Sequence, residues 1–162
     1  MELRIGNGWD FHRLIEDLDR PLKLGGYTLP GPLALAGHSD ADVLYHALCD
    51  ALAGAMALAD IGQVFADTDE ANRDLDSARI VEYYQSQMEA AGWQLMNADL
   101  TLIGERPKIS PHTAAIRASI AAQLQVDPQR VGLKATTTEK MGALGRSEGL
   151  ACMASVLLQR VP

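Results

Sequence analysis

The clearest hydrophobic pattern lies in residues 39–58, where apolar side chains return every three or four positions. They are Leu44, Ala47, Leu48, Ala51, Ala55 and Leu58. This period predicts an amphipathic helix that buries one face. Ser39, with Asp42 three residues later, predicts the start of the helix, because such a pair binds free amides of the first turn. On the polar side Asp42, His46 and Asp50 recur every four residues and form a row of groups suited to metals or protons.

Two more helices and several strands follow from patterns of the same kind. We expect helices over residues 77–91, ended by Gly92, and over about 111–124. Alternation and turn residues predict strands over these segments: 3–12, 21–29, 93–104, 131–135 and 150–159. The first two strands are expected to pair as a hairpin. Residues 59–76 are polar with little period, which is typical of a functional loop or lid.

The resulting order, β-β-α-α-β-α-β-β, predicts the α+β class with a single sheet covered by helices. The chain has 162 residues, 48% of them apolar and 22% charged. These values are typical of a globular protein and exclude a disordered or collagenous one. We therefore expect one domain spanning 1–162.

Charge and hydropathy narrow the range of partners. The chain carries 14 Lys and Arg against 21 Asp and Glu, a formal net charge of −7, and no basic run. A nucleic acid partner is therefore not expected, whereas an anionic small molecule stays open because a metal or backbone amides can bind it. No apolar run approaches the roughly 18 residues of a membrane span, and the first residues lack the apolar segment of a secretory signal. We expect no membrane partner and a cytoplasmic location.

One carboxylate and two imidazoles form the first candidate site. Asp10 and His12 lie two residues apart, on one face of the first expected strand, and His46 lies on the first expected helix. Together they make the three-ligand set of an open zinc site, with a fourth position left for substrate. An Asp and a His at this spacing are also common in strands that bind no metal.

Two further segments carry groups that bind phosphates. His38 and Ser39 are expected at a helix N-terminus, where free amides favour an anion, although Ser39 has the alternative role of a simple cap. Thr136–Thr138, Glu139 and Lys140 offer hydroxyls, a carboxylate for Mg²⁺ and a cation; the alternative is a strand end with solvated charges. Three aspartates of the polar loop suit substrate hydroxyls or a divalent ion, or are merely solvated: Asp60, Asp67 and Asp69.

Several of these residues lie in longer segments that resemble a known family. The chain is similar, from about residue 3 to residue 160, to the 2-C-methyl-D-erythritol 2,4-cyclodiphosphate synthase family of the non-mevalonate isoprenoid pathway. The segments that carry the resemblance are GNGWDFH, AGHSDADVLYHALCDALAGAMALADIG, FADTD, ERPKISPH and LKATTTEKMGALGRSEGLAC. Ala66 stands where proline is usual in the family, and Ala143 and Leu144 stand where an aromatic residue is often seen.

The resemblance implies an activity and a set of residues for it. The expected enzyme is a lyase that cyclises 4-diphosphocytidyl-2-C-methyl-D-erythritol 2-phosphate and releases CMP, as a homotrimer with active sites shared between subunits. Zinc is implied at Asp10, His12 and His46, and Mg²⁺ or Mn²⁺ at Glu139. His38 and Thr137 are implied as catalytic contacts to the phosphates.

Further substrate contacts are implied by the same resemblance. Besides Asp10, His12, His38, Thr137 and Glu139, they are Ser39, Asp60, Ile61, Gly62, Phe65, Asp67, Asp69, Gly104, Pro107, Lys108, Ile109, Ser110, Thr136, Thr138, Ala143 and Arg146. The residues Gly104–Ser110 are expected to bind the cytidine of a neighbouring subunit's substrate, and Ala143 and Arg146 lie near an expected cavity on the threefold axis. Two other readings remain: a zinc-dependent phosphohydrolase, and a non-catalytic trimeric ligand-binding protein.

Overall fold

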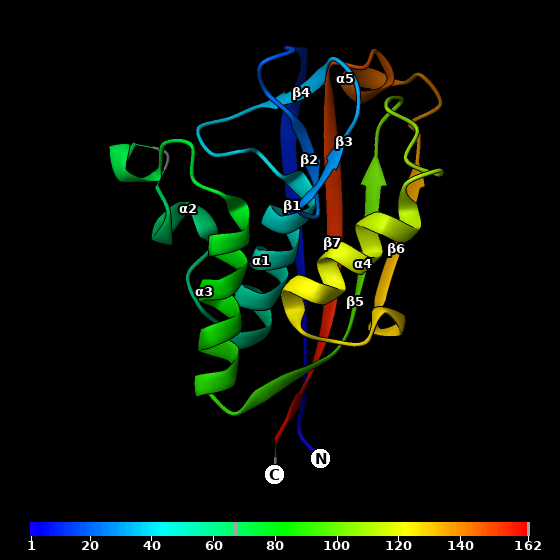
Figure 1. Cartoon of the computed structure of the whole chain (residues 1–162). Coiled ribbons are helices and arrows are strands. Elements are labelled where there is room, and N and C mark those ends of the chain that lie inside the picture. Colours follow the sequence, from blue (N-terminus) through cyan, green and yellow to red (C-terminus); the bar gives the residue numbers. More distant parts are fainter. Residues whose placement is uncertain (67, 162) are drawn as a thin grey trace.

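The computed structural model describes residues 1–66 and 68–161, and it has an α+β fold in which helices cover one face of a mixed sheet (Figure 1). Within these residues five strands lie side by side in the order β4-β1-β7-β5-β6. Their bounds are β1 Leu3–Glu16, β4 Leu33–Ala36, β5 Trp93–Ile103, β6 Val131–Thr136 and β7 Gly149–Arg160. Only the β5–β6 pair among these is parallel. Strands β2, Leu22–Leu24, and β3, Tyr27–Leu29, form a separate antiparallel pair.

Three longer helices pack against the sheet. They are α1 Val43–Met56, α3 Ser77–Ala90 and α4 Thr113–Leu124. Shorter turns of helix lie in the connections: α2 Ile61–Val64, α5 Gly142–Gly145, and two 3-10 turns, η1 Glu70–Asn72 and η2 Pro128–Arg130. No helix in the described residues is both long and apolar enough to cross a membrane.

The expected α+β class is confirmed, but the expected hairpin of the first two strands is wrong, four strands instead of two precede α1, and β2 and β3 form a second, small sheet. β1 pairs with β7 over Leu3–Arg13 and with β4 over Arg13–Glu16, and residues 21–29 fold on themselves around Gly25 and Gly26. Both glycines have positive φ, +61° and +75°, so they make a tight turn rather than a bulge in one strand. β4 is not among the expected strands, and the expected first strand ends at His12; β4 and Arg13–Glu16 are strands because they pair with each other.

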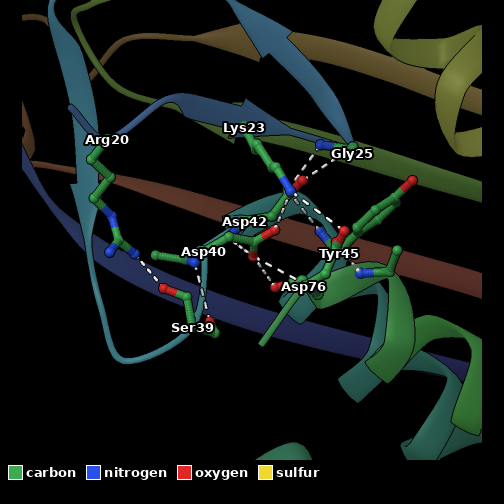
Figure 2. Close-up of polar contacts among 12 residues, drawn as sticks. Arg20, Lys23, Gly25, Ser39, Asp40, Asp42, Tyr45 and Asp76 are labelled. Atoms are coloured by element: carbon green, nitrogen blue, oxygen red, sulfur yellow. Dashed lines mark hydrogen bonds and ion pairs between the residues drawn. The ribbon is translucent and has the colours of Figure 1, made fainter. Parts of the chain in front are cut away.

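The start of α1 also differs from the expectation. Asp42, not Ser39, is the N-cap, and its Oδ1 accepts from the Leu44 and Tyr45 amides at 3.1 and 3.2 Å. Ala41 has a positive φ of 59°, so the chain turns sharply between Ser39 and the helix. The same Asp42 carboxylate is fully buried and accepts from two further amides of the β2–β3 turn (Figure 2). Asp42 therefore has a structural role. It does not belong to the row of groups suited to metals or protons that we expected it to form with His46 and Asp50.

The remaining helices lie close to their expected positions. Asp76 caps α3 at its start, Ala91 is its C-cap, and Gly92, which was expected as the cap, follows with a φ of +73°. The stretch 59–76, expected as a loop or lid, contains α2 and the 3-10 turn η1. The glycine-interrupted segment before β7 contains the single turn α5.

Two glycines of β1 bring α1 directly onto the sheet. A Cβ on Gly6 would lie 2.0 Å from the Ala51 carbonyl oxygen, and one on Gly8 would lie 2.1 Å from that of Ala47. Only glycine permits so close an approach of strand and helix. Side chains alternate along a strand, so Asp10 shares this covered face, and the approach places α1 beside it.

Candidate metal centre and active site

Asp10, His12 and His46 meet at the junction of β1 and α1. Their ligand atoms all lie within 4.8 Å of one another. Asp10 Oδ2 is 2.7 Å from His12 Nδ1 and 3.3 Å from His46 Nδ1. The three side chains form a site that can hold a divalent metal ion, in the place where the sequence led us to expect one.

Two buried atoms of these three side chains have no hydrogen-bond partner among the described residues and are therefore suited to bind a cation. Within residues 1–66 and 68–161, Asp10 Oδ2 and His12 Nδ1 are the buried side-chain nitrogen or oxygen atoms that lack a hydrogen-bond partner. They lie close together, but their angles do not suit a hydrogen bond. Buried polar atoms are normally satisfied, so such a pair marks a place where an ion completes the arrangement. The carboxylate and two imidazoles are ligands that zinc favours.

Electrostatics of the centre favour an ionised carboxylate. Burial by itself raises the pKa of Asp10, but the facing imidazoles of His12 and His46 outweigh it and bring the pKa down to about 2. Burial lowers the pKa of His46, while Asp10 opposes this and raises it above the ordinary value. Negative charge is thus fixed at a point where imidazole nitrogens converge, which is the electrostatic condition for cation binding.

A cavity of about 270 Å³ opens from this centre. It is lined by the three converging side chains and by Gly37, His38, Ser39, Asp50, Ile61, Gly62, Phe65, Asn72, Leu75 and Ile80. The expected residues His38, Ser39, Ile61, Gly62 and Phe65 therefore lie around the same cavity. Asp10 and His12 line it from the sheet, and Ile61, Gly62, Phe65, Asn72 and Leu75 line it from the connection between α1 and α3.

Hydrogen bonds from outside the cavity hold its walls in place. Arg20 donates to the Leu35 carbonyl at 2.6 Å. It also donates to the Ser39 carbonyl (Figure 2), and so fixes the segment that carries His38. Asp50 Oδ1 accepts from the Ile61 amide at 3.0 Å and holds the start of α2 against α1. Burial raises the pKa of Asp50, and the nearby Asp60 and Asp10 charges add to this.

A second group of expected residues lies together at another corner of the sheet. The turn Gly104–Ser110 meets the end of β6, where the Gly104 amide donates to the Thr136 carbonyl at 3.0 Å. The Lys140 amide donates to Glu105 at 3.0 Å, and Thr137 Oγ1 to Glu139 Oε1 at 3.0 Å. We call Gly104–Ser110 with Thr136–Glu139 the edge cluster. It contains Gly104, Pro107, Lys108, Ile109, Ser110, Thr136, Thr137, Thr138 and Glu139.

Within one chain, the edge cluster and the cavity lie apart from each other. Strand pairing runs from Phe11 through Ala151 and Ile103 to Thr136, a separation of three strands. At about 4.8 Å per strand the distance is roughly 14 Å. Phe11 and Thr136 also lie on the face opposite to Asp10 and His12. The described residues therefore hold two separate halves of the expected site.

The other expected residues have varied positions. Asp60 and Asp69 are exposed caps of α2 and η1, with Oδ1 bound to the Gln63 and Ala71 amides. Asp67 lies outside the described residues. Ala143 lines a separate open cavity of about 540 Å³ beside α5, and Arg146 is exposed and bound to Glu148 at 2.6 Å.

Two residues of the centre are absent from the set that the resemblance implied. Asp50 lines the cavity one helical turn beyond His46, and only its four-residue spacing marked it as suited to metals or protons. Ser77 lies 2.8 Å from His46 Nε2. No local pattern marks this serine, because it reaches the centre only when α3 packs on α1.

Comparisons with known proteins show strong similarity over the chain. The YgbB family model matches residues 3–159. The curated 2-C-methyl-D-erythritol 2,4-cyclodiphosphate synthase of Synechococcus sp. (strain CC9311) is 51% identical over 159 residues, which cover 97% of this chain and 95% of that protein.

Solved structures agree with the sequence similarity. The bifunctional IspDF of Campylobacter jejuni is 38% identical with a TM-score of 0.93; the match covers 98% of this chain and 42% of that one. The CDP complex of Plasmodium falciparum IspF is 30% identical with a TM-score of 0.87, covering 99% of this chain and 97% of that one.

Proposed function

The chain belongs to the YgbB family, together with curated 2-C-methyl-D-erythritol 2,4-cyclodiphosphate synthases, and we propose that it performs their reaction in the cavity between β1 and α1. It is an enzyme of isoprenoid biosynthesis that makes this cyclic diphosphate. We assign it the substrate 4-diphosphocytidyl-2-C-methyl-D-erythritol 2-phosphate, with CMP as the leaving group. The CDP complex of the Plasmodium falciparum relative supports a cytidine diphosphate ligand.

Zinc is the ion that we assign to Asp10, His12 and His46. The observation that carries this assignment is the buried pair Asp10 Oδ2 and His12 Nδ1, which lack hydrogen-bond partners while His46 Nδ1 faces the same carboxylate oxygen. When bound, the ion would neutralise charge on the diphosphate. The protein groups would fix its position, since all three side chains come from a packed strand and helix.

The groups at the mouth of the cavity would position the phosphates. The attacking atom is a phosphate oxygen that is already ionised at neutral pH, so the reaction requires no general base. His38 and Ser39 lie on the cavity wall, where an imidazole N–H and a hydroxyl can donate to phosphate oxygens and keep attacking and leaving groups in line. This is how we assign His38 its catalytic role.

The edge cluster would supply the other half of the site from a second subunit. Thr136–Thr138 offer hydroxyls, with Thr137 as the second catalytic contact, and Glu139 would hold Mg²⁺ or Mn²⁺ between the phosphates. The turn with Pro107 and Lys108 would hold the cytidine. The support is geometric: both parts of the cluster meet at one exposed corner, about three strands away from the cavity in the same chain.

A homotrimer is the assembly that we propose, and the open face of the sheet supports it. Four large apolar side chains of β1 lie on the sheet face opposite α1, α3 and α4. They are Leu3, Ile5, Trp9 and Phe11, and they are 47–76% exposed. Such a row of large apolar side chains is unusual on the surface of a monomer. The cavity beside α5, lined by Ala143 and adjoining Phe11, lies on this side and would face the threefold axis near Arg146.

We place the enzyme in the cytoplasm as one domain of residues 1–162. The helices and the sheet share one hydrophobic core, which supports the single domain. Cys49 and Cys152 are both buried and free, as is usual for a protein of a reducing compartment.

The experiment that tests the function is product analysis with isotopic water. The purified protein receives the cytidyl substrate with Zn²⁺ and Mg²⁺ in H₂¹⁸O, and mass spectrometry follows the products. Cyclisation releases CMP and incorporates no ¹⁸O, because the nucleophile is a phosphate of the substrate. Incorporation of one ¹⁸O into the sugar phosphate or CMP would indicate a phosphohydrolase, and unchanged substrate would indicate a binding protein.

A further inference from the structure

A polar chain leads from the surface to the back of the metal centre. It begins at Lys23, whose Nζ lies 3.1 Å from Asp40 Oδ2 (Figure 2). It continues from Asp40 Oδ1 to the Ser77 hydroxyl. Ser77 Oγ lies 2.8 Å from His46 Nε2, the ring nitrogen that faces away from Asp10. The chain thus ends on one of the three proposed metal ligands.

The single proton of the Ser77 hydroxyl determines the direction of these hydrogen bonds. Asp40 is ion-paired with Lys23 and, as a carboxylate, only accepts hydrogen bonds. Ser77 must therefore donate its proton to Asp40, and it presents only lone pairs to His46. The contact at 2.8 Å then requires that His46 Nε2 carries the ring proton and donates it.

This requirement fixes the free nitrogen of His46. With the proton on Nε2, the lone pair of the neutral ring lies on Nδ1, which is the atom that faces Asp10 Oδ2 at 3.3 Å. Metal-bound histidines commonly use their second nitrogen in this way, since the partner selects the tautomer and fixes the orientation of the ring.

We propose that Asp40 and Ser77 are positioning residues that hold His46 in the Nε2–H form, so that Nδ1 is free to bind the metal. Lys23 keeps Asp40 an acceptor. The inference rests on the proposed metal site at Asp10, His12 and His46. It explains why α3 packs with Ser77 fully buried at its first residue, although Asp76 already caps the helix.

The test uses three variants of the full-length protein. Ser77→Ala removes the nearer acceptor of His46 Nε2, at 2.8 Å, and leaves the more distant Ser39 hydroxyl at 3.4 Å. Asp40→Asn keeps the shape but offers an amide N–H to Ser77, which allows the Ser77 hydroxyl to turn and donate to His46. Asp76→Asn is the matched control: Asp76 also contacts Lys23, at 3.5 Å, and caps α3, but it does not touch the Ser77 hydroxyl, and asparagine caps a helix equally well.

Two measurements separate a positioning role from a merely structural one. Competition with a chromophoric chelator gives zinc affinity, which we expect to fall about tenfold to a hundredfold in Ser77→Ala and Asp40→Asn and less than about twofold in Asp76→Asn. Nitrogen-15 spectra of the zinc-loaded wild type should show metal on His46 Nδ1 and a slowly exchanging proton on Nε2. That proton should exchange rapidly in Ser77→Ala while the amide spectrum away from the site is unchanged.

The outcomes distinguish this inference from the metal assignment itself. If both variants bind zinc as tightly as Asp76→Asn, or if the wild type carries its His46 proton on Nδ1, the positioning role is wrong while the metal site stands. If His46→Ala binds zinc as tightly as the wild type, both the metal site and the positioning role are overturned.

Discussion

The two faces of β1 have opposite characters although they belong to one strand. The covered face carries Gly6, Gly8, Asp10 and His12. The two glycines let α1 approach so closely that His46 lies beside Asp10 and His12. On the open face Ile5, Trp9 and Phe11 are exposed and apolar. The side chains of the proposed metal centre all come from one chain, whereas the open face leaves large apolar side chains in solvent. One strand thus carries the proposed metal ligands on one side and the proposed subunit contact on the other.

The largest effect is expected from removing the helix side of the metal centre. His46→Ala should lose zinc and at least about a hundredfold in turnover, because two ligands do not form the open three-ligand site. Folding should persist, since alanine favours the helix. Metal analysis and a turnover assay check this, with His112→Ala as control because His112 contacts Tyr27 far from the cavity. Full zinc retention in His46→Ala would contradict the assignment.

A side chain on Gly8 should disturb the close contact between α1 and the covered face of β1, and so lower the stability of the fold. Gly8→Val places atoms where a Cβ alone would lie 2.1 Å from the Ala47 carbonyl oxygen, so we expect unfolding to become easier by about 3 kcal/mol. Gly54→Ala is the control, because its Cβ would lie 3.7 Å from the Asn7 carbonyl oxygen, an ordinary contact distance. Alanine there should stabilise the helix by up to about 1 kcal/mol. Denaturant unfolding measures both, and equal stabilities would disprove the packing argument.

Charges on the open face should separate assembly from metal binding. The double variant Trp9→Glu with Phe11→Glu should form monomers, because carboxylates at these positions repel across a shared axis. Zinc binding per chain should stay within about twofold, since Asp10 and His12 lie on the other face, while turnover should fall at least about tenfold through loss of shared sites. Light scattering, metal analysis and an activity assay give the three values. A fully active monomer would show that the open face serves no assembly.

The edge cluster should affect turnover with little effect on stability. Among the residues that the structure describes, the exposed Glu139 side chain forms one hydrogen bond, from Thr137 Oγ1 at 3.0 Å. Glu139→Gln should therefore lower turnover about tenfold, through loss of a charged ligand for the second ion, and leave the Tm within about 2 °C. Thermal unfolding and rates at saturating Mg²⁺ check this. Turnover equal to the wild type would remove Glu139 from the site.

The sequence predicts the parts of the molecule that depend on local patterns, and it does not predict the parts that depend on contacts between distant segments. The covered face of β1 and the period of α1 were visible, because Asp10 and His12 alternate locally and His46 lies on a regular helix. The turn at Ala41 and the buried role of Asp42 were not, because the latter depends on amides of Gly25 and Gly26, distant in sequence. β4 was missed for the same reason, since its strand character comes from pairing with the end of β1.

The smallest effect expected is a partial recovery that directly tests whether the two halves of the site come from different subunits. One chain carries Lys108→Glu with Pro107→Gly, which damages the edge cluster, and the other carries His46→Ala. Each is inactive alone, but a mixed trimer contains interfaces where an intact edge cluster meets an intact metal centre. With equal amounts and random exchange, about a quarter of the sites have the required order of subunits, so activity should return to about a quarter of the wild type.

Differently tagged chains verify the exchange by co-purification. If mixed trimers form and remain inactive, each chain must complete its own site, and the roughly 14 Å between cavity and edge cluster would have to close within one subunit.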